Sequence, residues 1–417
     1  MSSVKCGCNR RGFLRRLCVA AGLLPIGLGA REKKGPVKES ARALADTRPT
    51  TVFLCGDVMT GRAVDQILPH PNTPELYEPY IRDARAYIEL AERESGPIPR
   101  PADFAYIWGD ALAEWRRAAP DLRIVNLETA VTESAEPWPG KGIHYRMHPK
   151  NAPCLTAAGI DCCVLANNHV LDWGYAGLEE TLETLRAAGI RTAGAGLDLA
   201  QAQAPAVLEI PGNGRVLVFA FGHGSSGIPW RWGAGRNQPG VNRLEDLSDR
   251  AADRIAEQVH TRKRAGDIVV ASIHWGGNWG YEIPSEQRRF AHRLIDLGSF
   301  DLVHGHSSHH PKAIEVYRNR AILYGCGDFF NDYEGIGGKE EYRGDLALMY
   351  FPTIDPATGK LVRFAMTSTR TERFRVTRAS AGDARWMRDV LTREAGRFGT
   401  GVSLDDDNRL SLTWQSE

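Results

Sequence analysis

The sequence predicts an α/β fold. Short apolar runs typical of buried strands alternate along the chain with longer segments that have helical periodicity. Most of these runs are followed at once by Asp, Asn, Glu or His, and strand ends are where α/β sheets bind their ligands. With 417 residues, of which 42% are hydrophobic, the chain is also long enough to bury a large core.

The N-terminal segment is typical of an export signal. Arg10 and Arg11 precede an apolar stretch at residues 17–29 that ends in small residues. This pattern predicts a twin-arginine signal peptide over residues 1–30, which a receptor reads and which does not anchor the protein. An amphipathic helix is the alternative, but the stretch is apolar all round. Residues 31–49 are charged and are interpreted as a linker. We therefore expect an exported protein, periplasmic or on the cell surface.

Charge and cysteine content narrow the functional class. The net charge of +1 offers no basic field for nucleic acid, so a nucleic-acid partner is not expected. Three of the eight cysteines fall in the predicted signal. The other five are odd in number and lie mostly in apolar runs, which does not indicate a disulfide framework.

Three strands in the first half of the chain end in candidate ligands. Residues 51–55 are followed by Asp57, residues 122–125 by Glu128, and residues 162–165 by Asn167, Asn168 and His169. Two of these residues have an alternative reading, because Asp57 could cap a following helix and Glu128 could be a loop carboxylate that faces solvent.

Between the first two strands lies a proline-rich insertion, residues 63–120, with helical segments at 81–94 and 106–117. A strand-like piece at 141–149 carries Arg146, which could contact an anionic substrate or lie on a solvated edge strand.

The second half repeats the pattern. We expect helices at residues 178–188, 244–265 and 285–298, and strands at 215–221, 267–273 and 301–303. The last two strands lead to His274 and to His306, His309 and His310. A hairpin over residues 313–317 and 321–324 follows, and then strands at 360–366 and 374–376 and a helix at 384–397.

These strand ends together predict a metal site. A single histidine after a strand is more often a structural residue than a ligand, but unrelated loops would not all carry oxygen or imidazole donors. Carboxylate, amide and imidazole donors suit Mn, Fe or Zn. Two such ions roughly 3.5 to 4 Å apart can clamp the attacking and leaving oxygens of a phosphoester.

Five motifs in order resemble the CapA family of capsule and poly-γ-glutamate biosynthesis, which is related to calcineurin-like metallophosphoesterases. They are Gly56-Asp57-Val58-Met59-Thr60-Gly61-Arg62, Asn126-Leu127-Glu128, Ala166-Asn167-Asn168-His169 with Asp172 and Gly174, His274-Trp275-Gly276, and Gly305-His306-Ser307-Ser308-His309.

The resemblance implies a four-layer αββα sandwich of metallophosphoesterase type, in which two sheets pack face to face between helices. It covers residues 51–331. We therefore expect a CapA-like domain over residues 50–350, including the insertion 63–120, and a C-terminal extension at 351–417 packed on that domain.

The resemblance also implies site roles and one or two divalent metal ions. Asp57 and His309 would hold the first metal, Glu128 would bridge, and Asn168, His274 and His306 would hold the second. His169 would act as a catalytic acid or stabilise developing charge. Arg62, Arg146 and Asn167 would bind the anionic substrate.

Three motifs depart from the phosphoesterase pattern. Asp-x-His reads Asp57-Val58-Met59, so one imidazole is missing at the first metal. Gly-Asn-His-Glu has Val170 in place of its acid, and the final Gly-His-x-His is stretched, which leaves both His309 and His310 open as the ligand. A one-metal site, or a site that binds without hydrolysing, is an alternative.

The leading hypothesis is an exported metal-dependent hydrolase of a phosphoester or a cell-envelope polymer, working beside capsule synthesis or export machinery. The main rival is a non-catalytic assembly factor that binds an anionic capsule polymer. An amidase or transpeptidase acting on γ-glutamyl bonds is a third reading, for which no Ser, Cys or Thr nucleophile with a placed base can be identified.

Overall fold

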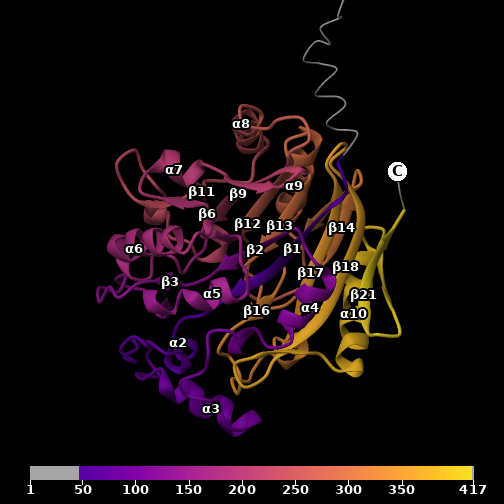
Figure 1. Cartoon of the computed structure of the whole chain (residues 1–417). Coiled ribbons are helices and arrows are strands. Elements are labelled where there is room, and N and C mark those ends of the chain that lie inside the picture. Colours follow the sequence, from indigo (N-terminus) through magenta and orange to yellow (C-terminus); the bar gives the residue numbers. More distant parts are fainter. Residues whose placement is uncertain (1–46, 416–417) are drawn as a thin grey trace, which may run out of the picture. The chain divides into compact units, whose positions relative to one another are not determined.

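Two large β-sheets dominate residues 47–415, which are the residues that this computed structural model describes (Figure 1). The predicted α/β class is confirmed. The predicted signal peptide and most of the predicted linker lie outside the described residues. Within residues 47–415, no helix is both long enough and apolar enough to cross a membrane.

The larger sheet contains ten strands within the described residues, in the order β20-β21-β18-β17-β1-β2-β5-β6, with β16 paired to β1 and β19 paired to β18. Its strands are β1 (Thr50–Val58), β2 (Leu122–Leu127), β5 (Cys162–Val164), β6 (Arg191–Ala193), β16 (Asp328–Phe330), β17 (Leu346–Asp355), β18 (Lys360–Thr371), β19 (Val376–Arg378), β20 (Thr400–Leu404) and β21 (Arg409–Trp414). The first and the last strands of the described residues share this sheet, and β1 lies between β2 and β17 (Figure 1).

The second sheet contains seven strands within the described residues, in the order β11-β9-β12-β13-β15-β14, with β8 paired to β9. Its strands are β8 (Ala206–Ile210), β9 (Gly214–His223), β11 (Arg243–Leu244), β12 (Ile268–His274), β13 (Leu302–His306), β14 (Ile314–Tyr317) and β15 (Arg320–Leu323). Two small ladders pair β3 (Ala130–Val131) with β4 (Arg146–Met147) and β7 (Ala195–Gly196) with β10 (Gly240–Val241).

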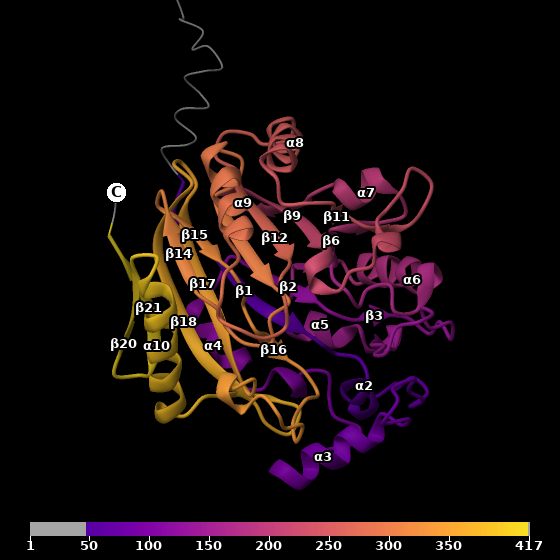
Figure 2. The same cartoon turned by 180° about the vertical axis from the view of Figure 1, so that it is seen from behind.

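Helices connect these strands. They are α2 (Ala63–Ile67), α3 (Arg85–Ser95), α4 (Ala111–Ala118), α5 (Pro153–Ala157), α6 (Gly174–Ala187), α7 (Leu199–Gln203), α8 (Asp249–His260), α9 (Ser285–Asp296) and α10 (Ala381–Gly396). Short 3-10 turns occur at η1 (Tyr106–Trp108), η2 (Pro149–Asn151), η3 (Gly224–Ser226), η4 (Trp230–Trp232) and η5 (Glu340–Tyr342). Figure 2 shows α9 lying along β12.

The alternation of side chains along β9 shows how the second sheet is covered. Val216 and Val218 belong to the core cluster that also includes strands of the larger sheet. Leu217 and Phe219 point the other way and pack in a separate cluster with α8 and α9, for example with Phe290. Successive residues of a strand face opposite sides of the sheet. The second sheet is therefore buried on both faces, which is usual for parallel strands such as β9, β12 and β13.

The predicted helix over residues 244–265 is wrong at both ends. Leu244 lies in β11, and α8 begins only after Ser248, whose side chain accepts a hydrogen bond from the backbone N–H of Ala251. This N-cap fixes the start of the helix, and α8 ends at His260. The strand-like piece predicted at 141–149 is likewise reduced to β4, Arg146–Met147.

Candidate active site

Parallel pairing brings the predicted strand-end residues together. Asp57 lies near the end of β1 and pairs in register with Asn126 of β2, and Glu128 follows directly after β2. In the other sheet, His274 and His306 are the last residues of β12 and β13 and pair with each other. Asp57 lies inside a strand and not at a helix N-cap, and Glu128 is only 2% exposed, so the alternative readings of both residues are wrong.

Two buried carboxyl groups lie at the base of the site. Asp57 and Glu128 are in hydrogen-bond contact, and Asn126 donates from Nδ2 to Asp57 Oδ1 at 2.7 Å. Burial and the neighbouring Asp328 raise the pKa of Asp57 to about 7. Burial and Asp57 raise the pKa of Glu128 well above its usual range. Two carboxylates this close require a shared proton or a bound cation.

The contacts of the histidines beside these carboxyl groups need more hydrogens than neutral imidazole rings supply. His274 Nδ1 lies 2.7 Å from Nδ1 of His306, and His274 Nε2 lies 2.8 Å from Oδ1 of Asn168. A neutral imidazole has a single N–H, so both contacts of His274 are satisfied only if His306 donates from Nδ1, while Nε2 of His306 faces Ser272 Oγ at 2.8 Å. An imidazolium would instead be a buried charge, since His274 is 1% exposed.

This donor set fits a metal ion. Ligand atoms of Asp57, His274 and His306 all lie within 4.8 Å of one another. Carboxylate oxygens and imidazole nitrogens converge there with fewer hydrogens than the contacts need, and a cation supplies the missing positive charge. A mixture of oxygen and nitrogen donors is the kind of set that suits Mn, Fe or Zn, and the metal stays a prediction.

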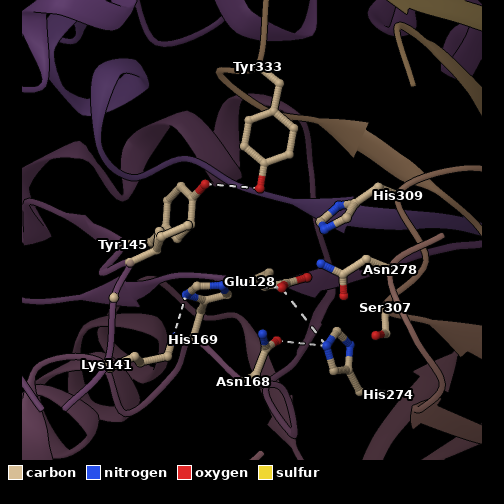
Figure 3. Close-up of a pocket in the computed structure, with 12 residues that line it drawn as sticks. Glu128, Lys141, Tyr145, Asn168, His169, His274, Asn278, Ser307, His309 and Tyr333 are labelled. Carbon is tan, nitrogen blue, oxygen red and sulfur yellow. Dashed lines mark hydrogen bonds and ion pairs between the residues drawn. The ribbon is translucent and has the colours of Figure 1, made fainter. Parts of the chain in front are cut away.

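A pocket of about 340 Å³ opens above these residues (Figure 3). It is lined by Glu128, Lys141, Gly142, Ile143, Tyr145, Asn168, His169, His274, Asn278, Ser307, His309 and Tyr333. Tyr145 donates its hydroxyl hydrogen to the hydroxyl of Tyr333 at 3.1 Å. In Figure 3, His169 and Lys141 lie across the pocket from His309 and Asn278.

His169 is held by a carboxylate and a lysine. Its Nδ1 lies 2.7 Å from Oδ2 of Asp172 and 2.9 Å from Nζ of Lys141, which also donates to Asp172. Asp172 and Lys141 compete for Nδ1, because this nitrogen would donate to a carboxylate but would have to accept from an ammonium. Since Lys141 already donates to Asp172, the tautomer with its hydrogen on Nδ1 pairs His169 with Asp172 and leaves Nε2 facing Glu128 Oε1 at 3.7 Å. Burial lowers the pKa of His169 to about 4, although Asp172 opposes the shift.

The structure separates His309 from His310. His309 lines the pocket, and its Nδ1 lies 2.9 Å from both carboxylate oxygens of Asp328. Burial opposes protonation there, but Asp328 raises the pKa of His309 above its usual value. His310 is fully buried, and its Nε2 accepts a hydrogen bond from the backbone of Gly280 at 3.1 Å. His309 is therefore the histidine placed to act in the pocket.

The three residues predicted to bind substrate do not line this pocket. Arg62 is buried in ion pairs with Glu78 and Asp332. Arg146 donates to Ser134 and Thr73, and its guanidinium stacks over a tryptophan ring.

Asn167 is also buried. It donates to Asn126 Oδ1 and Leu127 O, and its own Oδ1 accepts from the backbone of His169. All three side chains thus have internal partners that keep them out of the pocket.

Comparison with known proteins places this fold and site in a family. The pattern of the bacterial capsule synthesis protein PGA_cap family matches residues 51–333. The chain belongs to this family. A polyglutamine synthesis accessory protein of Mycobacterium tuberculosis is 49% identical over 363 residues, which cover 87% of this chain and 95% of that protein.

More distant relatives of this PGA_cap family member are named CapA, so the predicted resemblance is confirmed. The capsule biosynthesis protein CapA of Bacillus anthracis is 24% identical over 72% of this chain and 63% of its own length. The PGA biosynthesis protein CapA of Bacillus subtilis is 25% identical over 66% of this chain and 62% of its own length.

Four site residues of this PGA_cap protein were not assigned from the sequence: Asn126, Lys141, Asp172 and Asp328. Three of them had a signal. Asn126 opens the motif that carries Glu128. Asp172 stands inside the motif that carries His169, and Gly327-Asp328 repeats the Gly56-Asp57 pattern on a strand that pairs with β1. Lys141 follows no strand, so the pattern of ligands at strand ends could not find it.

Proposed function

We propose that this PGA_cap protein is a metal-dependent hydrolase that assists the synthesis of a capsule or poly-glutamate polymer, acting on a phosphoester or a cell-envelope polymer. One observation carries the proposal: a buried, proton-poor cluster of carboxylate, amide and imidazole groups lies directly below a pocket that also presents His169. A site needed only for folding would satisfy these groups among themselves.

Six residues would hold one or two ions of Mn, Fe or Zn: Asp57, Glu128, Asn168, His274, His306 and His309. When bound, the metal would supply Lewis acidity. Asn126 would position Asp57 through its hydrogen bond to Oδ1, and Asp328 would orient His309.

The protein's own proton chemistry would centre on His169. Asp172 holds Nδ1–H, so Nε2 is the atom that can receive a proton from water or return one to a leaving group. Lys141 fixes Asp172 from the other side and adds positive charge to the pocket wall, where an anionic substrate group would lie. The predicted substrate contacts of Arg62, Arg146 and Asn167 have no such access.

The setting of this activity is part of the proposal. Names of the relatives refer to capsule, PGA and polyglutamine synthesis, which favours an accessory role beside capsule machinery. The Arg10-Arg11 signal pattern supports export by the twin-arginine route to the periplasm or cell surface. The two large sheets, with a shared core cluster and α8 and α9 outside one of them, support a four-layer metallophosphoesterase sandwich.

The test is metal content together with turnover. The mature protein should bind one or two Mn, Fe or Zn per chain and hydrolyse a synthetic phosphodiester such as bis(p-nitrophenyl) phosphate, or shorten poly-γ-glutamate. His169→Ala should keep the metal and lose turnover. A protein that binds the polymer equally well with and without His169, and turns over neither probe, would instead be the non-catalytic assembly factor.

A further inference from the structure

A chain of hydrogen bonds runs behind His306, away from the pocket. We propose that Ser272 and His304 are positioning residues that fix the proton of His306 on Nε2, so that Nδ1 is its ligand atom. This inference rests on the proposed metal site, because the choice of nitrogen matters only if His306 binds a cation.

The chain begins at a backbone carbonyl of the other sheet. His304 Nε2 lies 2.7 Å from the carbonyl oxygen of Cys55 in β1. Ser272 Oγ lies 3.1 Å from His304 Nδ1 and 2.8 Å from His306 Nε2. Cys55, Ser272 and His304 are fully buried, and His306 is 1% exposed. Ser272 and His304 are also paired in register between β12 and β13, so the strands themselves hold the contact.

The position of each hydrogen in this chain follows from the position of the hydrogen before it. The carbonyl of Cys55 can only accept, so His304 carries its hydrogen on Nε2. His304 is then an acceptor at Nδ1, and the single hydroxyl hydrogen of Ser272 points to it. The oxygen of Ser272 is therefore the acceptor for His306, which must carry its hydrogen on Nε2. The lone pair of His306 lies on Nδ1, toward His274 at 2.7 Å.

The reverse order of protons is unfavourable. It would either need a second hydrogen on His304, because the carbonyl of Cys55 always requires the first, or leave the buried Nδ1 of His304 facing the oxygen of Ser272 with no hydrogen between them. In the first case, His304 would be a fully buried cation whose hydrogen-bond partners in the described residues are a carbonyl and a hydroxyl, with no carboxylate. Burying an ion without a counter-charge is strongly unfavourable.

These hydrogen bonds therefore orient the proposed ligand atom of His306 without adding a charge behind it. Outer partners that orient a ligating histidine typically contribute about 10–100-fold to metal affinity. Ser272 and His304 supply that orientation through neutral groups, and the anchor at Cys55 ties His306 of the second sheet to the strand that carries Asp57. Removing the hydroxyl should free His306 to exchange tautomers.

The test uses the full mature protein labelled with ¹⁵N-histidine, with Ser272→Ala compared with Ser299→Ala. Ser299 is a matched control, since it is also fully buried and its Oγ lies 3.4 Å from a histidine, His260, away from the site. In metal-free wild type, His306 should show the Nε2–H tautomer. Ser272→Ala should show mixed tautomers and about 10–100-fold weaker Mn²⁺ or Zn²⁺ binding by calorimetry, and Ser299→Ala neither.

A wild-type His306 that carries its hydrogen on Nδ1, or Ser272→Ala with unchanged tautomer and affinity, would overturn the relay. If Ser272→Ala does not fold, His304→Gln and His304→Leu decide, because only the glutamine amide can donate to Cys55 and accept from Ser272. Equal metal affinity in those two variants would also overturn it. Failure of wild type to bind any metal would refute the proposed function, while the tautomer of the metal-free protein would still test the relay.

Discussion

Two histidines of the site, His169 and His306, have different kinds of hydrogen-bond partner. On one side of the pocket, His169 faces the buried carboxylate of Asp172, which Lys141 also contacts. Below the pocket, the buried His306 faces the hydroxyl of Ser272. A carboxylate partner stabilises an imidazolium and suits a histidine that gains and loses a proton, as in other acid–base sites.

A hydroxyl partner fixes the tautomer of an imidazole but adds no negative charge. That suits a histidine whose task is to present a lone pair, which protonation would remove. For His169 and His306, the partner behind the ring, rather than the ring itself, distinguishes the proposed proton transfer from the proposed metal binding. His309 differs from both, because its proposed ligand role goes with a carboxylate partner, Asp328. The following predictions test that separation.

The largest effect should come from the base of the site. Asp57→Asn and His274→Ala each remove a ligand, so the metal content of the purified protein should fall to near zero, a larger loss than the roughly 10–100-fold expected for an outer partner. Elemental analysis measures it, with His260→Ala as the control because His260 ends α8 away from the site. Wild-type metal content in both variants would place the metal elsewhere.

His169→Gln should have the opposite effect on metal content, which it should leave unchanged. The metal should remain, because the His169 ring is held by Asp172 and Lys141 rather than by the cluster around His274. Turnover should fall by about 10²- to 10⁴-fold, the usual contribution of a positioned acid or base. Parallel measurement of metal content and kcat checks this. Loss of metal together with activity would mean that the two sides of the pocket are not separate.

The sequence could predict where the candidate ligands lie because their places follow from strand ends. Asp57, His274 and His306 each stand at the end of a parallel strand, and parallel strands deliver their ends to one edge of a sheet. The class of fold follows from the same alternation of strand and helix. The meeting of the two sheets at one pocket was implied only by family resemblance.

What the sequence could not predict depends on contacts between distant segments. Arg62 looked available for an anion, but Asp332, distant by 270 positions, neutralises it. Lys141 had no local pattern, and only the folding of its loop over Asp172 brings it to the pocket. The proton order behind His306 needs three strands at once, so no spacing within one segment could reveal it.

The ion pair behind His169 should also matter for stability. Asp172→Ala leaves Lys141 as a largely buried charge without its partner, and breaking a buried pair in this way costs about 3–5 kcal/mol. Urea unfolding of the variant and of wild type measures the difference in their free energies of unfolding. Glu183→Ala is the control, because it breaks an exposed pair with Arg186 and should change stability little. A cost no greater than that of the control would show that Asp172 serves His169 alone.

The smallest effect concerns Asp65, a buried carboxylate outside the metal cluster. Burial raises its pKa to about 6 from a usual 3.8, although the backbone of His148 and the amide of Asn151 donate to it. Its stabilising contribution is greatest below the unfolded pKa and is lost as the pH rises through the folded one.

Wild type should therefore lose about 3 kcal/mol relative to Asp65→Asn over the whole transition, of which about 2 kcal/mol falls between pH 4 and pH 6, at 1.36 kcal/mol per pKa unit. Urea unfolding of both proteins across that range measures the difference, in which all other titrating groups cancel. If the difference in unfolding free energy does not change with pH, the N–H donors around Asp65 fully offset the effect of burial on its pKa. Asp65 would then be stabilised as an anion by these N–H groups together with the nearby guanidinium of Arg146.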